Sequence, residues 1–85
     1  MELKEQFLQA AADSKSLSEK PSNDTLLNLY SLYKQASEGD VNVDPPSNPF
    51  DFVNKAKHQA WFDLKGITKE EAMQQYVSLV EKLKG

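Results

Sequence analysis

The chain has 85 residues, a formal net charge of −3 and no cysteine, and all ten of its basic residues are lysine. This length fits one domain, the acidic balance is unlike that of a general nucleic-acid binder, and the absence of thiols excludes disulfides and thiolate metal sites. Because arginine is also absent, a bound anion would be held by lysine ammonium groups, hydroxyls and backbone N–H groups.

Helical periodicity dominates, and the first two predicted helices lie on either side of Pro21. Near the N-terminus the apolar stripe is Leu3, Phe7, Ala10 and Ala11. After the proline, Ser22 or Asn23 can cap a second helix, and Gly39 stands where a C-cap glycine is expected. The buried side of the second helix is predicted to carry Leu26, Leu29, Tyr30, Tyr33 and Ala36.

Two further helices are expected in the second half of the chain. The third should run from about Asp51 to Leu64 and end at Lys65 and Gly66. Its apolar positions are Phe52, Val53, Ala56, Ala60, Trp61 and Leu64. A capping box at 68–71 begins the fourth helix, whose apolar stripe is Ala72, Tyr76, Leu79, Val80 and Leu83. No segment alternates with a period of two, so the predicted fold class is all-α with four helices.

The connections constrain how these helices are arranged. Only a few residues around Gly66 join the third and fourth helices, so we expect antiparallel neighbours. About fourteen residues, 37–50, separate the second and third helices, and such a loop can span up to ~45 Å when extended. It can therefore return along the bundle and leave these two helices parallel. Three prolines within it reduce the entropy lost on ordering.

Aromatic and lysine side chains share faces of the second and third helices. Tyr30 and Lys34 are four residues apart, and Tyr33 lies one turn from Tyr30 on its flank. Lys57 and Trp61 are also four residues apart. In one interpretation, phenols and ammonium groups converge on a phosphorylated nucleotide and a ring stacks on its purine. In the other, the rings belong to the core and the lysines are solvated. Composition and spacing leave both interpretations open.

Candidates for catalysis or metal binding are weak. His58 is the sole histidine and has no cysteine or second histidine to share a metal. Ser31 lies inside a predicted helix without an evident base, so a nucleophilic role is not expected. The segment 40–51 lacks the glycine and the final glutamate of a calcium loop. We expect no catalytic residue and no metal site.

Nothing in the chain resembles a targeting or membrane-spanning segment. The N-terminal residues 1–5 are charged, unlike a signal peptide. The uncharged stretch from Thr25 to Tyr33 is too short and polar to cross a bilayer. We therefore expect a cytoplasmic protein without a membrane span.

Two motifs at a characteristic separation resemble the acyl-CoA-binding protein (diazepam-binding inhibitor) family. The first is Tyr-Ser-Leu-Tyr-Lys-Gln-Ala at 30–36, and the second is Lys-Ala-Lys-His-Gln-Ala-Trp at 55–61. Further matches are Phe7, Ala10-Ala11, Pro21, Gly39-Asp40, Asp51-Phe52, Leu64-Lys65-Gly66, Ala72-Met73 and Tyr76. The resemblance runs nearly end to end. It implies a single acyl-CoA-binding domain over residues 1–85, folded as an up-down-down-up four-helix bundle.

The resemblance also implies a function and a set of site residues. It implies binding of long-chain fatty acyl-CoA thioesters, without catalysis or cofactor, by a monomeric intracellular carrier and pool former in fatty acid metabolism. By position, the contacts to the phosphorylated adenosine end and its surroundings are Lys15, Tyr30, Tyr33, Lys34, Lys57 and Tyr76. Positions matching those near the acyl chain and pantetheine are Phe7, Ala10, Leu26 and Leu27.

The chain departs from the family pattern at three places. His58 stands where tryptophan is usual, Val53 stands where lysine is frequent, and the proline-rich loop at 44–49 is about one residue longer. Two other functions compete with acyl-CoA binding. A helical protein–protein interaction module would use the aromatic surface and ignore CoA. An acyl-CoA hydrolase would need a nucleophile or a general base at the thioester, and none is visible.

Overall fold

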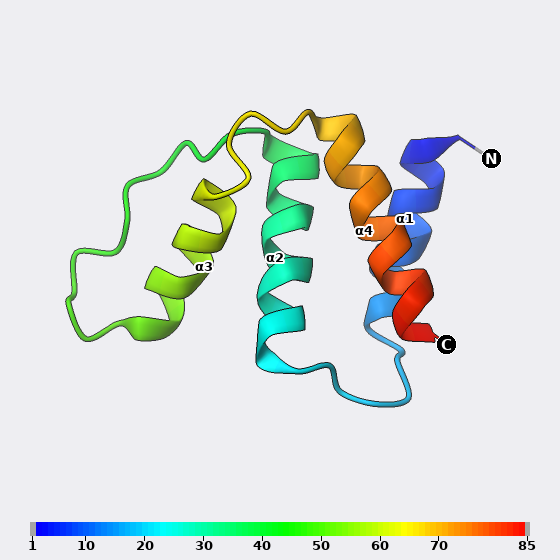
Figure 1. The fold of residues 1–85 in the computed structure, drawn as a ribbon, viewed down its shortest axis with the longest axis horizontal. Helices are drawn as coiled ribbons and strands as arrows, with labels where there is room; N and C mark the ends of the chain where they lie inside the picture. The colour runs from blue at the N-terminus through cyan, green and yellow to red at the C-terminus, as the bar shows by residue number, and fades with distance from the viewer. Residues whose placement is uncertain (1, 85) are drawn as a thin grey trace.

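The computed structural model describes residues 2–84, which form four helices (Figure 1). α1 spans Leu3–Ser14, α2 spans Asn23–Glu38, α3 spans Phe52–Phe62 and α4 spans Lys69–Lys84. No strand occurs among the described residues. The predicted all-α class with four helices is confirmed, and α3 is slightly shorter at both ends than the sequence indicated.

The four helices form a flat layer in the spatial order α3, α2, α4, α1 (Figure 1). The molecule measures 41 × 28 × 15 Å along its principal axes. α1 and α4 run in one direction and α2 and α3 run in the other, which is the expected up-down-down-up arrangement (Figure 1). The predicted parallel orientation of the second and third helices is confirmed.

One expectation about neighbours is wrong. α3 and α4 are antiparallel, but they do not pack directly, because α2 lies between them (Figure 1). The connection between them crosses the C-terminal end of α2, where it is anchored. Gln35 near the end of α2 donates a hydrogen bond of 2.7 Å to the carbonyl oxygen of Ile67 in this connection. A short loop was therefore compatible with a helix standing in between.

Local hydrogen bonds explain where the helices begin and end. The Ser22 hydroxyl accepts from the backbone N–H of Thr25 at 3.2 Å, so Ser22 is the cap of α2. The Thr68 hydroxyl likewise accepts from the N–H of Glu71 at 3.1 Å and begins α4. At the end of α2, Gly39 has a φ of 83° and a ψ of −151°, a conformation that glycine adopts far more readily than other residues.

The hydrophobic core lies between α1, α2 and α4. Its buried residues are Phe7, Ala10, Leu29, Leu32, Ala36, Ala72, Tyr76 and Val80. In contrast, the apolar stripe predicted for α3 is largely exposed, with Phe52 at 70% and Val53 at 66%. Of that stripe, Trp61 is buried against α2. Because α3 contacts one neighbouring helix, the first half of α3 leaves apolar side chains open beside α2.

No helix within residues 2–84 combines the length and the apolar character needed to cross a bilayer.

Candidate functional site

A pocket of about 190 Å³ lies between α2, α3 and the loop that joins them. We call it the head-group pocket. Its walls are Tyr30, Lys34, Glu38, Val43, Asp44, Pro46, Asn54, Lys57, His58 and Trp61. The structure thus brings together Tyr30, Lys34 and Lys57, three of the predicted site residues that come from the two separate motifs.

Each lysine of the pocket lies beside an aromatic ring. The ammonium nitrogen of Lys57 is 5.3 Å from the centre of the Tyr30 ring. The ammonium nitrogen of Lys34 is 5.1 Å from the centre of the Trp61 ring. These are cation–π distances, and they hold positive charge against the aromatic walls of the pocket. Such an arrangement suits an anion that carries a flat ring system.

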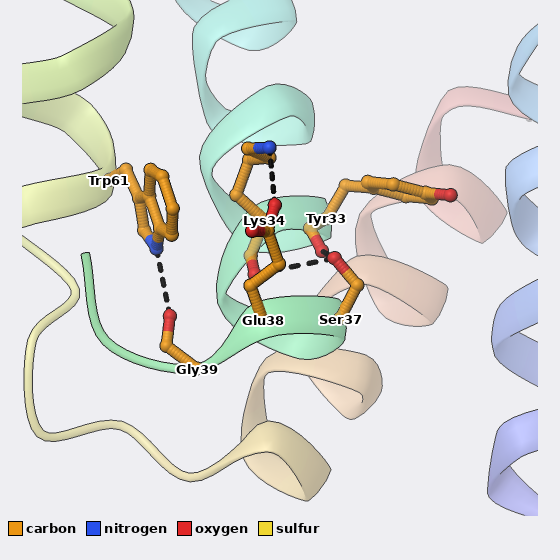
Figure 2. Close-up of polar contacts among 6 residues, drawn as sticks. All are labelled: Tyr33, Lys34, Ser37, Glu38, Gly39 and Trp61. Carbon is orange, nitrogen blue, oxygen red and sulfur yellow. Dashed lines mark hydrogen bonds and ion pairs between the residues drawn. The ribbon is translucent and has the colours of Figure 1, made fainter. Parts of the chain in front are cut away.

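The two lysines differ in how far their charge is already neutralised. Lys34 forms an ion pair and hydrogen bond with Glu38, one turn further along α2 (Figure 2). The hydrogen bond that Lys34 donates to Glu38 raises the pKa of Lys34 above its ordinary value. Lys57, in contrast, belongs to none of the ion pairs among residues 2–84. Lys57 is therefore the ammonium group more available to an incoming phosphate.

Beside Trp61, one of the walls of the head-group pocket, hydrogen bonds join elements that are far apart in sequence. The indole N–H of Trp61 donates to the carbonyl oxygen of Gly39 at 2.9 Å (Figure 2). One carboxylate oxygen of Asp40 accepts from the backbone N–H of Gly66 and from the side-chain amide of Gln35, each at 2.9 Å. Both bonds lower the pKa of Asp40, and the bond from Gly66 has the larger effect. Together they hold α3 in position against the end of α2.

His58 connects α3 to the loop over the pocket. Its Nε2 atom lies 2.9 Å from the carbonyl oxygen of Val43, so the ring donates a hydrogen bond to the loop backbone. This contact draws Val43 and the adjacent Asp44 into the pocket wall. His58 is thus a polar anchor that fixes this loop to α3.

An apolar groove of about 410 Å³ adjoins the head-group pocket. We call it the apolar groove. Its lining residues are Asn23, Leu26, Leu27, Phe52, Val53, Ala56 and Lys57. It therefore includes Leu26 and Leu27, two of the four residues predicted near the acyl chain. Lys57 lines both cavities, so the polar pocket and the apolar groove meet at this one side chain.

Other predicted site residues lie elsewhere. Tyr33 and Tyr76 form an aromatic cluster with Phe7, with ring centres 5.4 Å apart for Phe7–Tyr33 and 5.2 Å apart for Phe7–Tyr76. Tyr33 projects from α2 away from Lys34 and Trp61 (Figure 2). The Tyr76 hydroxyl donates to the Ser14 hydroxyl at 3.2 Å.

Three more predicted positions lie outside the two cavities. Phe7 and Ala10 belong to the core, with 4% and 3% of their surface exposed. Lys15 follows the last residue of α1 and is exposed. Neither the head-group pocket nor the apolar groove is lined by Lys15, Phe7, Ala10, Tyr33 or Tyr76. Their contacts with a ligand stay predictions.

Five pocket residues were not expected from the sequence, and three of them are polar: Glu38, Asp44 and Asn54. Glu38 follows Lys34 by four residues and Asn54 precedes Lys57 by three, so helical spacing alone offered a signal for both. Asp44 lies in the loop, and its position depends on contacts such as the His58 bond. Among the described residues, no group of histidine and carboxylate side chains could hold a metal ion.

Comparison with known proteins gives a consistent result. Residues 4–80 match the family model "Acyl CoA binding protein". The chain is 49% identical over 77 residues to "Acyl-CoA-binding protein homolog 1" of Caenorhabditis elegans, an alignment covering 91% of this chain and 88% of the relative. It is 48% identical over 77 residues to the "Acyl-CoA-binding protein" of Dictyostelium discoideum, with 91% and 90% covered. The crystal structure of Oryza sativa Acyl-CoA-Binding Protein 2 has a TM-score of 0.90 at 39% identity, over 96% of this chain and 90% of that chain.

Proposed function

This chain belongs to the acyl-CoA-binding protein family, and we propose that it binds a long-chain fatty acyl-CoA thioester across the head-group pocket and the apolar groove. The observation that carries the proposal is the position of Lys57, which lines both cavities. A ligand with a phosphorylated nucleotide at one end and a hydrocarbon chain at the other needs this kind of continuous polar-to-apolar site.

The head-group pocket supplies what a phosphorylated adenosine requires. The ammonium groups of Lys34 and Lys57 attract phosphate, and the phenol of Tyr30 can donate a hydrogen bond to it. The aromatic walls offer a surface for a purine. Since the pocket is open to solvent, the attraction between ammonium and phosphate should weaken as salt is added.

The apolar groove supplies what a fatty acyl chain requires. Its walls include Leu26, Leu27, Phe52 and Val53, and the side chains of Phe52 and Val53 are mostly exposed. Each methylene removed from water contributes up to ~0.8 kcal/mol. Affinity should therefore rise with acyl length until the groove is filled, and free fatty acid, which lacks the head group, should bind poorly.

The remaining predicted contacts are part of the proposal on the strength of the family resemblance. We propose that Lys15, Tyr33 and Tyr76 contact the phosphorylated adenosine end of the ligand and its surroundings from outside the walls of the head-group pocket. Tyr33 is 42% exposed and Lys15 is exposed, so both side chains can be reached from solvent. Phe7 and Ala10 are proposed to lie near the acyl chain and pantetheine of the ligand.

A wider role follows from binding without chemistry, since proteins of this family bind acyl-CoA and do not convert it. We propose that residues 1–85 act as one acyl-CoA-binding domain, of which Met1 and Gly85 lie outside the described residues. We further propose that the protein is a cytoplasmic monomer that carries long-chain acyl-CoA and maintains a pool of it.

Calorimetric titration of the protein with palmitoyl-CoA, CoA and palmitate tests the proposed function. We expect a dissociation constant for palmitoyl-CoA well below the values for both fragments, and a weaker interaction at higher salt. Equal affinity for palmitoyl-CoA and palmitate would contradict a role for the head group. An assay for free thiol over the same samples should show no hydrolysis, and native mass spectrometry of protein purified from cells should identify the acyl length carried.

A further inference from the structure

Glu38 is a carboxylate at the place where the proposed ligand needs positive charge. It is the last residue of α2, and its side chain lines the head-group pocket and pairs with Lys34 (Figure 2). The C-terminal end of a helix carries partial negative charge from its unpaired carbonyl groups, so the helix does not stabilise a carboxylate there. The partner that stabilises this carboxylate is the Lys34 ammonium group.

The formal charges of the side chains that line the head-group pocket cancel. Lys34 and Lys57 contribute two positive charges, and Glu38 and Asp44 contribute two negative charges, with His58 counted as neutral. A phosphate that enters this pocket therefore meets a formally neutral lining. It can gain the full attraction of Lys34 only when Glu38 releases the ammonium group.

We propose that Glu38 is a specificity-determining residue that competes with the ligand's phosphate for the Lys34 ammonium group. Head-group binding at Lys34 is then an exchange, in which one anion leaves the ammonium as another arrives. Glu38 lowers the affinity for phosphate and weakens the preference for ligands with more phosphate groups. This inference rests on the proposed function, since it assigns the phosphate site to the head-group pocket.

The geometry favours competition over a supporting role for Glu38. One side of the Lys34 ammonium group faces the Trp61 ring, 5.1 Å from its centre. Glu38 occupies a second direction with a direct hydrogen bond (Figure 2). A phosphate that bound the same ammonium with Glu38 in place would lie close to the carboxylate, and two like charges at such a distance repel. Both side chains are partly exposed, with 29% of Lys34 and 40% of Glu38 accessible, so Glu38 can turn into solvent.

The test compares Glu38→Gln with Glu81→Gln, a control that removes the same charge. Glu81 lies in the last turn of α4, 3.8 Å from a lysine and outside both cavities. The probes are adenosine 3′,5′-bisphosphate and adenosine 5′-monophosphate, each titrated by calorimetry. Removal of a partly exposed ion-pair partner should lower the dissociation constant for the bisphosphate about two- to fivefold in Glu38→Gln, with a smaller effect on the monophosphate. Glu81→Gln should bind both probes as the wild type does.

A Lys34→Met background separates competition from a general effect of charge or folding. In that background the Glu38→Gln change should bring little or no gain, since no ammonium group remains for the two anions to share. The competition is overturned if Glu38→Gln binds the bisphosphate no better than the wild type, or if the full gain persists without Lys34. Failure of the wild type to bind palmitoyl-CoA would instead overturn the proposed function, while the bisphosphate titration still decides the role of Glu38.

Discussion

The indole nitrogen of Trp61 lies 2.9 Å from the carbonyl oxygen of Gly39, and this hydrogen bond joins the buried ring of α3 to the end of α2. The ring is 2% exposed. Replacement of Trp61 by Phe should keep most of the apolar contact but leave the Gly39 carbonyl without its donor. We expect a loss of about 1–3 kcal/mol in the free energy of unfolding, measured by urea denaturation. Phe62→Leu, at the adjacent and exposed aromatic residue, is the control and should change little.

Replacement of Lys57 should weaken the binding of acyl-CoA, because its ammonium group is available to the phosphate of the proposed ligand. Lys57→Met removes the ammonium group where the pocket meets the groove but keeps an apolar stem of similar length. We expect palmitoyl-CoA to bind about tenfold more weakly, since a charge-assisted contact to phosphate is lost. The salt dependence of binding should also become shallower. Lys82→Met on α4 removes the same charge away from both cavities, and equal losses in the two variants would contradict the site assignment.

Leu27 should contribute through the acyl chain alone. Leu27→Asn places a polar side chain in the wall of the apolar groove. Titrations with octanoyl-CoA and palmitoyl-CoA should then show a smaller gain in affinity with chain length, with palmitoyl-CoA weakened by about 1 kcal/mol. Leu8→Asn, at an exposed position on α1, should retain the wild-type gain. A uniform loss for both acyl lengths would place the acyl chain elsewhere.

Two glycines test whether backbone conformation or space limits substitution. Gly39 and Gly66 have φ values of 83° and 97°. A Cβ at Gly39 would lie 3.4 Å from the flexible end of Lys69, and one at Gly66 would meet nothing within 4 Å. Since backbone strain acts at both positions, Gly39→Ala and Gly66→Ala should each lower the free energy of unfolding by about 1–3 kcal/mol in urea. A penalty confined to Gly39→Ala would show that the contact with Lys69 dominates.

Asp40 should make the free energy of unfolding decrease at low pH. Its hydrogen bonds with Gly66 and Gln35 lower its pKa in the folded state below the ordinary value of 3.8. A group with a depressed folded-state pKa adds stability above its unfolded pKa, and that stability is lost as the pH falls through the folded pKa. Urea denaturation between pH 6 and 2.5 should therefore show a shallower acid loss in Asp40→Asn than in the wild type. Parallel profiles would contradict this role.

Much of the fold could be predicted from the sequence, because the helix-capping residues and the apolar stripes agree with the packing of the helices. Ser22, Thr68 and Gly39 act at helix ends as their chemistry predicts, and the stripe of α4 buries Ala72 and Val80. The apolar positions of α3 wrongly suggested a buried face, because helical periodicity identifies an apolar face but not the element that covers it. Where no second helix packs, as at Phe52 and Val53, that face becomes the wall of a groove.

The candidate site was readable only in part, for a similar reason. Spacing of four residues predicted that Tyr30 and Lys34 share a face, and the structure brings Lys57 to them across the gap between two helices. Spacing could not show that Tyr33 turns towards Phe7, since that depends on the order of the helices in the layer. Nor could it place Asp44, whose loop is fixed by contacts distant in sequence.

The attachment of α3 to one neighbouring helix has a consequence for motion. α3 buries only Trp61 among its residues, and an element with few buried apolar contacts opens at lower free energy than the core, as a separate cooperative unit. A ligand seated between α2 and α3 would bridge this interface, so binding of the ligand and rigidity of α3 are coupled. Loading of the carrier would then be accompanied by protection of α3 from hydrogen exchange and proteolysis.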